Sequence, residues 1–433
     1  MIKVKAQSRI EKISVILLIV GLVIGVVAGA LGVYFSAVPA ATKAGYEEGY
    51  KVGYEKGYAA GKAAAPPVTV PKGPIVVGAL LPITHETGIR YKWGLDLAIE
   101  EINAKGGVDG RPIVVQYLDS KRKADASVSA AHKFVTEYKV SLVLGPGITP
   151  TCAAVAPIFE EAHLPSIGCS RANEMTGAGG LKDPYKYWFR LAPSAELLGK
   201  KAAEDIKKLG LGTKIAYLYI DTGYGASTFE ATKKYAEKLG LKTVYEEKFP
   251  RGTKDFSAYM AKIKAIKPDV LLWVGYVSEG IAGITEFKEQ GLDKVGIKLY
   301  SASDHPTLST VVKALGDKLE GCYIIAPYIA GILPTAKDFE EKFKAKYGEY
   351  PDIFGAYGYV MGWVAYYALK KASPLTGEPK KDREKITEAL YTIKFDSIFG
   401  PDTYFDKSGQ LVVAGEYPAC TVVYKKGNWV RVT

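Results

Sequence analysis

Cysteine and histidine are both scarce, with four of each among 433 residues. The cysteines are Cys152, Cys169, Cys322 and Cys420; they form no CxxC pair, and the histidines show no HExxH or comparable spacing. Structural zinc needs such paired ligands, and a disulfide-built fold needs more cysteines in a much shorter chain. We therefore expect no metal site and no disulfide framework, while one or two isolated disulfides stay open.

The motifs of several enzyme classes are also missing. The chain has no GxSxG nucleophile turn, no GxxxxGK[ST] phosphate loop and no GxGxxG dinucleotide fingerprint. Gly145-Pro146-Gly147 comes near the last of these, but it lacks a third glycine and has a proline between the two. Adjacent carboxylates such as Glu100 and Glu101 would point apart on a helix, as on a solvated surface. These absences predict a protein that is not an enzyme and holds no cofactor.

Concentrated charge is missing as well. The formal net charge is +11, from 57 basic and 46 acidic residues, but only residues 1–12 carry a local excess, of +3. The remaining charge is spread thinly, as on a solvated surface, so we expect no nucleic-acid partner. Apolar residues make up 48% of the chain, which is enough for a sizeable core.

One long apolar run is present. Residues 13–38 read ISVILLIVGLVIGVVAGALGVYFSAV without a charge, and at about 1.5 Å per residue such a helix exceeds the roughly 30 Å hydrocarbon core. The basic residues 1–12 precede it, so the positive-inside rule places them in the cytoplasm and the rest of the chain outside. We predict a retained single-pass anchor in the cell membrane with an extracellular globular part. Cleavage near Ser36–Ala40, as in a signal peptide, is the alternative.

Residues 39–73 would form a stalk and linker. Within them, GYEEGYKVGYEKGYAAG at 45–61 repeats glycine and tyrosine with a period of four. On a helix this would place the two residue types in neighbouring stripes, although each glycine costs about 1 kcal/mol relative to alanine. A flexible spacer fits equally well, and self-association of the stalk stays open. The proline-rich stretch 63–74 marks the start of the globular part.

Beyond Pro74, short apolar runs alternate with amphipathic stretches. The runs that predict strands are 75–81, 113–118, 141–145, 214–220, 269–275, 297–301 and 321–327. Between the first two, apolar residues at positions 95, 98, 99 and 102 fall on one face of a helix. Continuously apolar strands separated by helices predict parallel sheets covered on both faces. Such sheets bind ligands at the carboxyl ends of their strands.

Polar side chains follow several of these strands. Thr149 stands in the loop after 141–145, at the start of a predicted helix whose free N–H groups suit a carboxylate. Further strand ends present Cys169, Ser170, Arg171, Tyr224, Tyr276 and Asp304. Together these groups could clamp a small zwitterion. Each one taken alone is also explained as a helix cap or a loop residue.

In this order and spacing, the strand-end motifs resemble the leucine/isoleucine/valine-binding family of extracytoplasmic solute receptors that serve ABC importers. The most specific segments are LGPGITPTCAAVAPIFEEAHLPSIGCSRANEMT at 144–176 and KFPRGTKDFSAYMAKIKAIKPDVLLWVGY at 248–276. The resemblance implies a type I periplasmic-binding-protein fold. In this α/β fold, two doubly wound parallel-sheet lobes are joined by a three-strand hinge, here preceded by one transmembrane helix. Lobe one would comprise residues 74–191 and 328–399, and lobe two residues 192–327 and 400–433.

The resemblance also assigns site residues. The family's carboxylate-binding hydroxyl falls on Thr149 and its second loop on Cys169–Arg171. Its cleft-closing tyrosines fall on Tyr224 and Tyr276, and the acid that meets the ligand ammonium falls on Asp304.

Arg171 departs from the family, which usually has a small hydroxyl residue at this position. The loop at 81–87 also differs from the family's loop of Ser, Gly and an aromatic. An inward guanidinium would favour an acidic amino acid or an organic acid. An outward one, paired with Glu174 or Asp183 at the surface, leaves a site for a neutral amino acid. We predict the outward orientation and a neutral aliphatic ligand, such as a branched-chain amino acid.

The predicted function is therefore delivery of a small amino acid to ABC permease subunits. A ligand that touches both lobes would stabilise the closed form, which the permease recognises. The alternatives are a ligand-sensing receptor ectodomain of the same fold, a binding protein for an acidic ligand, and a surface enzyme. A sensory receptor would continue into a cytoplasmic signalling domain, for which residues 1–12 are too few.

Overall fold

The computed structural model describes residues 73–172, 175, 185–415 and 419–433. The predicted cytoplasmic flank, membrane anchor and nearly all of the stalk, residues 1–72, lie outside this part of the chain. Within the described residues, no helix combines the length and the apolar character that a membrane crossing requires.

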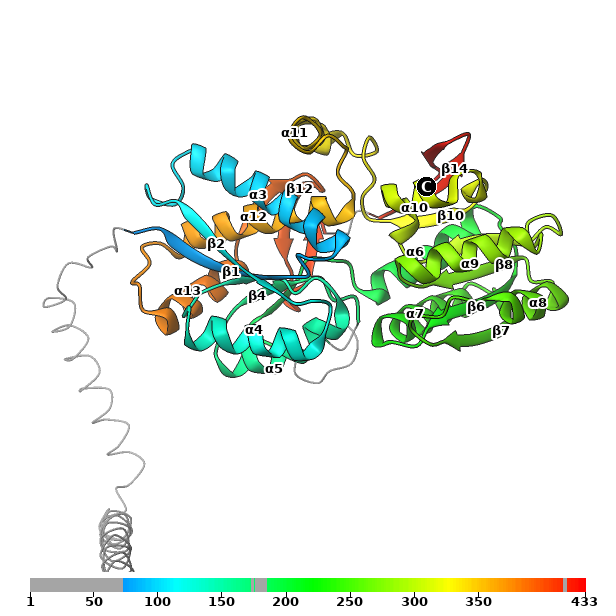
Figure 1. Cartoon of the computed structure of the whole chain (residues 1–433), viewed down its shortest axis with the longest axis horizontal. Helices are drawn as coiled ribbons and strands as arrows, with labels where there is room; N and C mark the ends of the chain where they lie inside the picture. The colour runs from blue at the N-terminus through cyan, green and yellow to red at the C-terminus, as the bar shows by residue number, and fades with distance from the viewer. Residues whose placement is uncertain (1–72, 173–174, 176–184, 416–418) are drawn as a thin grey trace, which may run out of the picture. The chain divides into compact units, whose positions relative to one another are not determined.

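The first lobe is built on a five-stranded parallel sheet with helices on both faces (Figure 1), in the strand order β2-β1-β3-β4-β5. Its leading elements are, in chain order, β1 (Ile75–Leu81), α3 (Glu86–Ala104), β2 (Ile113–Asp119), α4 (Ala124–Thr136), β3 (Val143–Leu144), α5 (Thr149–Glu161), β4 (Ser166–Gly168) and β5 (Trp188–Arg190). Six of the seven residues of β1 are buried, because the sheet is covered on both sides. The continuously apolar run at 75–81 therefore predicted this strand correctly.

The second lobe contains a seven-stranded sheet in the order β15-β14-β10-β9-β8-β6-β7. Its central part comprises α6 (Ala195–Lys208), β6 (Lys214–Ile220), α7 (Gly223–Lys238), β7 (Lys242–Phe249), α8 (Ser257–Ile266), β8 (Val270–Val274), α9 (Val277–Glu289), β9 (Lys298–Ser301), the 3₁₀ helix η3 (His305–Thr307), α10 (Ser309–Leu315), η4 (Gly316–Leu319) and β10 (Tyr323–Ala326). Strands β6 to β10 pair in parallel. The sheet is completed by the antiparallel strands β14 (Cys420–Lys425) and β15 (Asn428–Arg431), which the sequence pattern did not predict.

Between β10 and β14 the chain returns to the first lobe. The returning elements are η5 (Pro334–Ala336), α11 (Lys337–Tyr347), α12 (Ile353–Ala372), α13 (Pro379–Leu390), β11 (Lys394–Ser397), β12 (Gly400–Phe405) and β13 (Leu411–Val413). The last three form a separate antiparallel sheet.

The predicted lobe boundary at residue 400 is wrong. Residues of the β12–β13 region pack on the first lobe: Arg190 N donates to Gly409 O at 2.7 Å, and the Phe405 ring lies 5.1 Å from that of Phe189. The third crossover therefore lies between Val413 and Cys420. The prediction failed because short antiparallel strands carry no βα alternation from which a crossover can be inferred.

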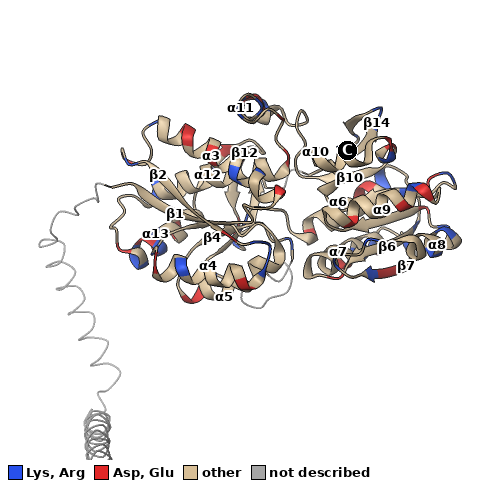
Figure 2. Cartoon of the chain, in the orientation of Figure 1, with Lys and Arg blue, Asp and Glu red and all other residues tan. Residues whose placement is uncertain are grey.

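Charged side chains of both signs are interspersed over the helices of both lobes (Figure 2). Several form exposed pairs, such as Lys233 with Glu246 at 2.5 Å and Lys318 with Glu289 at 2.7 Å. Each such pair contributes about 0 to 1 kcal/mol, so the fold depends on its buried apolar residues rather than on these pairs.

Helices α3 and α12 approach each other closely because glycines line their contact. An added Cβ at Gly94 would lie 1.9 Å from the carbonyl oxygen of Gly355, and one at Gly358 would lie 2.0 Å from that of Tyr91. Neither backbone can yield without separating the helices, so these glycines fix the position of Tyr91 on α3.

We expect Gly358→Ala to destabilise the protein by about 1 to 3 kcal/mol or more, because the added methyl group forces α3 and α12 apart. The matched control is Gly280→Ala on α9, where an added Cβ meets nothing within 4 Å. There, alanine should be neutral or stabilising by up to about 1 kcal/mol, because it is the better helix former. Urea midpoints of the two variants measure the difference; equal midpoints would show that the α3–α12 contact is not tight.

Candidate functional site

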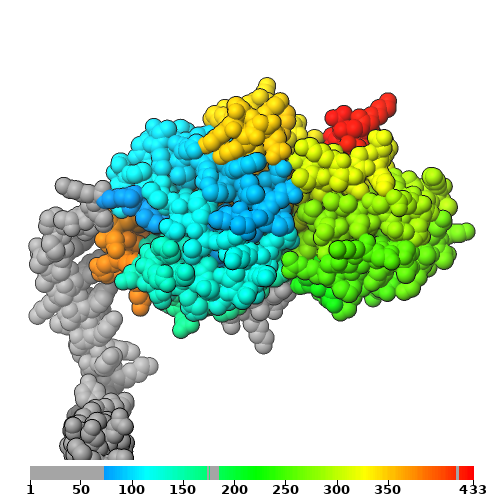
Figure 3. Space-filling view, viewed as in Figure 1, coloured from blue at the N-terminus to red at the C-terminus, as the bar shows by residue number. Residues whose placement is uncertain are grey.

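A small cavity, with about 40 Å³ open to the centre of a water molecule, lies where the two lobes meet at the carboxyl ends of their strands. On the face drawn in Figure 3, first-lobe atoms in blue to cyan touch second-lobe atoms in green to yellow along a seam. Six of the seven predicted site residues line this cavity: Thr149, Cys169, Arg171, Tyr224, Tyr276 and Asp304. Their role in ligand binding stays a prediction.

Ser170, the seventh predicted residue, does not line the cavity. It is fully buried, and its hydroxyl donates to Thr149 Oγ1 at 3.2 Å. Arg171 N donates to the same oxygen, also at 3.2 Å. Ser170 therefore positions Thr149, the first residue of α5, at a helix N-terminus, whose partial positive charge suits a carboxylate.

Arg171 and Asp304 form a buried ion pair across the cleft, between Nη2 and Oδ2. Arg171 follows β4 in the first lobe and Asp304 follows β9 in the second. The exposed fractions of their side chains are only 9% and 2%. Burial by itself lowers the pKa of Arg171, but the Asp304 carboxylate leads the opposing influences that raise it well above its ordinary value. The guanidinium is therefore charged, and the Asp304 carboxylate across the cleft offsets its charge.

The predicted outward orientation of Arg171 is wrong. The structure does not describe Glu174 or Asp183, the proposed surface partners. The guanidinium instead faces the cavity, because a buried carboxylate in the other lobe gives it a partner there. A pairing between residues 133 positions apart leaves no trace in local sequence.

Two stacked tyrosines close one side of the cavity. The rings of Tyr224 and Tyr276 lie 5.5 Å apart at 23°, and the Arg171 guanidinium carbon lies 5.9 Å from the Tyr224 ring centre. Both hydroxyls are buried without a well-formed hydrogen bond, although Ser303 and Thr222 lie near enough to influence their pKa values. Burial raises the pKa of Tyr224 to about 12, so its hydroxyl stays protonated and can donate to a ligand.

The sequence prediction missed seven cavity residues, four of which have ring side chains. These four are Tyr91 on α3, Phe354 and Tyr357 on α12, and His305 in η3. The Tyr91 ring lies 5.2 Å from that of Phe354 and 6.2 Å from that of Tyr357, in the contact that Gly94 and Gly358 permit. The available signal was a helix that opens with the aromatic and glycine pattern IFGAYGY directly after the capping residue Asp352.

A second polar bridge joins the lobes beside the cavity. Arg90 on α3 pairs with Glu349 at 2.8 Å and Asp352 at 3.2 Å, and its Nη2 donates to Ser309 of the second lobe at 3.0 Å. Burial raises the pKa of Asp352 to about 6 against the opposing influence of Arg90. This bridge holds α10 against the first lobe and so helps to position η3.

All four cysteines are free and buried, so none of the disulfides left open by the sequence is present. Burial raises the pKa of Cys169 to about 12, so the thiol in the cavity wall is protonated. It serves as an apolar surface rather than as a nucleophile. Among the described residues, no group of three or more His, Cys, Asp or Glu side chains could hold a metal.

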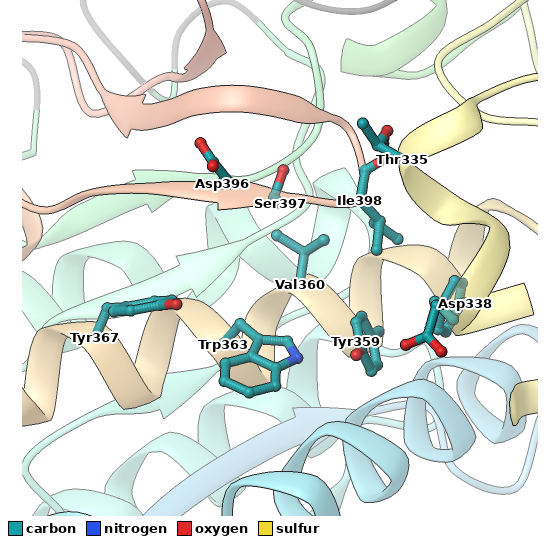
Figure 4. Close-up of a pocket in the computed structure, with 10 residues that line it drawn as sticks. Thr335, Asp338, Tyr359, Val360, Trp363, Tyr367, Asp396, Ser397 and Ile398 are labelled. Atoms are coloured by element: carbon teal, nitrogen blue, oxygen red, sulfur yellow. Dashed lines mark hydrogen bonds between the residues drawn. The ribbon is translucent and has the colours of Figure 1, made fainter.

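Another hollow lies on the first lobe, between α12 and β11 (Figure 4). Tyr359, Trp363 and Tyr367 of α12 line it, opposite Asp396 and Ser397 of β11. It is larger than the cleft cavity, but it touches no second-lobe element and lies away from the predicted strand-end residues. A ligand in it could not favour lobe closure directly.

The two-lobed fold and the interlobe cavity define a solute receptor, and the family follows from the sequence comparison. Residues 74–420 match the profile of the periplasmic binding proteins, and the chain belongs to this family. The match confirms the resemblance and the type I fold predicted from the sequence.

Known relatives cover most of the chain. The Leu/Ile/Val-binding protein homolog 7 of Brucella abortus is 26% identical over 356 residues, 78% of this chain and 86% of that protein. A leucine-binding protein of Thermotoga maritima has a TM-score of 0.71 and 23% identity, covering 83% of this chain and 98% of that one. A solute-binding protein of an ABC transporter from Rhodopseudomonas palustris, in complex with 3,4-dihydroxybenzoic acid, has a TM-score of 0.71 and 24% identity, with coverages of 83% and 96%. These two structures establish the fold alone.

His305 should make stability depend on pH. Its side chain is 13% exposed, and burial lowers its pKa to about 4, against 6.5 when unfolded. Between these values the unfolded chain binds a proton that the folded chain does not, so this contribution to stability is complete above pH 6.5 and is lost as pH falls towards 4. The loss amounts to at most about 3 kcal/mol.

The measurement is the melting temperature of the parent and of His305→Gln between pH 7 and 4. Asp352 acts in the opposite direction, because its raised pKa makes the folded chain bind the extra proton, but its effect is common to both proteins. The difference in melting temperature between the parent and the variant should therefore shrink as the pH falls, because only the parent loses the stability that depends on a neutral His305. A constant difference across this range would contradict the buried, neutral state of His305.

Proposed function

We propose that the chain is an extracytoplasmic receptor that delivers a neutral α-amino acid to an ABC importer and does not transform it. The observation that carries the proposal is the Arg171–Asp304 pair, buried in a cavity that both lobes line. Because the two charges cancel, the inward Arg171 does not require an acidic ligand.

A zwitterion carries both charges of this pair, so it can give Arg171 a carboxylate in place of Asp304 and give Asp304 a cation in place of Arg171. Its carboxylate would meet Arg171 and the N-terminus of α5 at Thr149, while its ammonium would meet Asp304. A bare carboxylate could satisfy Arg171 only by approaching Asp304, and two like charges in a buried site repel strongly. The aromatic walls formed by Tyr91, Phe354 and the other rings favour an apolar side chain on the ligand.

The second candidate is an aromatic carboxylate. Five aromatic rings line the cavity, those of Tyr91, Tyr224, Tyr276, Phe354 and Tyr357, and the similar protein from Rhodopseudomonas palustris is in complex with 3,4-dihydroxybenzoic acid. Such a ligand would stack well on the rings. It would still need a way to reduce the negative charge of Asp304.

Transport would depend on closure of the two lobes. A ligand held by Arg171 on one side and Asp304 on the other stabilises the closed form by its differential affinity. The closed surface is the one that a permease would recognise.

The substitution Asp304→Asn separates the two ligand classes. We expect leucine-like ligands to bind about 30-fold more weakly or worse, because the ammonium loses its charged partner, a cost on the order of 2 to 5 kcal/mol. Aromatic carboxylates such as 3,4-dihydroxybenzoate should bind more tightly, because the repelling carboxylate is gone. Calorimetric titration of both ligand types into parent and variant measures this.

The control is Glu289→Gln, which removes an exposed negative charge from the second lobe far from the cavity. It should change neither affinity. The proposal fails if no amino acid raises the melting temperature of the parent, or if Asp304→Asn binds the parent's amino acid within threefold.

We also propose that residues 13–38 anchor the protein in the cell membrane with the lobes outside. The support is the uncharged length of that segment and the basic flank before it. Protease added to intact cells should release a soluble two-lobed fragment that starts within residues 39–73, while a cytosolic marker protein stays intact. If the lobes are protected from the protease until the cells are permeabilised, the proposed topology is wrong.

A further inference from the structure

Two arginines from different lobes converge on one tyrosine at the edge of the cleft. Arg122 follows β2 in the first lobe and Arg251 follows β7 in the second. The guanidinium carbon of each lies 5.7 Å from the ring centre of Tyr276. Tyr276 itself lines the ligand cavity, so the two cations lie next to the cavity wall.

These arginines lack the partner that other arginines of the cleft have. Arg171 pairs with Asp304, and Arg90 pairs with two carboxylates. Across the described residues, neither Arg122 nor Arg251 forms an ion pair, and Arg122 Nε is buried without a hydrogen bond. Elsewhere bases and acids are interspersed on the surface (Figure 2). This leaves an excess of positive charge at one place on the cleft.

The neighbouring groups offset this charge only in part. Arg122 Nη1 lies 2.8 Å from His85 Nε2, and burial lowers the pKa of His85, so this imidazole is a neutral acceptor. Glu279 is a buried acid that acts to raise the pKa of Arg122, and its carboxylate accepts from Gly252 N at 2.7 Å and from the Ser278 hydroxyl at 2.9 Å. This single carboxylate can offset only one of the two guanidinium charges. Glu86 also faces His85, but it accepts from Thr310 at 2.6 Å and lies 3.7 Å from Arg90.

In this arrangement of the lobes the two like charges lie close together. Burial, followed by the nearby Arg251, lowers the pKa of Arg122, which is the sign of this repulsion. A small anion placed between two guanidinium groups would offset the repulsion and join the lobes at a second point, since planar guanidinium groups bind carboxylates and oxyanions through parallel hydrogen bonds.

We propose that Arg122 and Arg251 form an interlobe anion subsite that takes one carboxylate or small oxyanion when the lobes are closed. The anion is either a carboxylate at the far end of the ligand or a free oxyanion from solvent. The first source rests on the receptor role proposed above, but it would make the ligand an acidic amino acid in place of the neutral one. The second source needs no amino acid and is the one that accompanies a neutral ligand.

Two arms of one experiment distinguish the sources, using the full chain in detergent and the double variant Arg122→Gln/Arg251→Gln. In the first arm, calorimetry compares L-glutamate with L-glutamine, which differ by the distal charge. If the ligand supplies the anion, the parent should prefer glutamate by about tenfold or more, and the variant should lose most of that preference. In the second arm, melting temperatures are compared in sodium sulfate and in sodium chloride at equal ionic strength, without any amino acid. If solvent supplies the anion, sulfate should stabilise the parent more than the variant.

Lys254→Gln is the matched control. Lys254 is exposed, belongs to the same loop as Arg251 and carries the same charge, but it makes no contact with Tyr276. It should behave as the parent in both arms. Because sulfate stabilises folded proteins in general, this variant also shows how much of the rise in melting temperature does not depend on the subsite. The subsite is overturned if the double variant matches the parent in both arms, even where glutamine binds normally. If no amino acid binds the parent, the proposed function fails, while the sulfate arm still decides the subsite.

Discussion

The buried pair of Arg171 and Asp304 is the interaction on which the cleft depends. Removing one partner of such a pair typically costs 3 to 5 kcal/mol, whereas replacing both by apolar groups is often neutral. The pair therefore adds little net stability. Its effect is to fix which surfaces meet, because β4 of one lobe and β9 of the other must end opposite each other for the two side chains to be satisfied. A different closure would leave one charge buried alone.

The remaining cavity features follow from the same strand ends and from one tight helix contact. Ser170 and the backbone of Arg171 hold Thr149, so the loop that supplies the cation also orients the hydroxyl at the start of α5. Gly94 and Gly358 let α3 and α12 approach, which stacks Tyr91 on Tyr357 in the cavity wall. The polar and apolar sides of the site thus depend on different parts of the fold, and a substitution can disturb one while leaving the other in place.

The sequence predicted the parallel strands well and the antiparallel ones poorly. The runs at 75–81 and 214–220 match β1 and β6 residue for residue, because strands covered on both faces must be apolar throughout. The sequence pattern did not predict strand β7, because this strand lies at the edge of its sheet and its residues alternate between exposed and half-buried. Six strand-end residues reached one cavity as predicted, since topology alone brings them together. The direction of Arg171 could not be predicted, because its partner is distant in sequence and lies on the other lobe.

The arrangement of the cavity also determines how much free energy each end of a ligand must contribute to lobe closure. Shifting two states from 1:99 to 99:1 requires about 5.5 kcal/mol of differential binding. Burying one large apolar side chain against the aromatic walls supplies only about 1.5 to 3 kcal/mol. Contacts that do not involve the ligand, such as Arg90 with Ser309, act in the empty closed form as well and add nothing to the difference. If the ligand is the amino acid proposed above, its charged end would have to supply the rest, because its carboxylate and ammonium would replace one direct pair between Arg171 and Asp304 with two. On this proposal, a ligand with only an apolar body, or only a carboxylate, would supply too little differential binding to close the lobes.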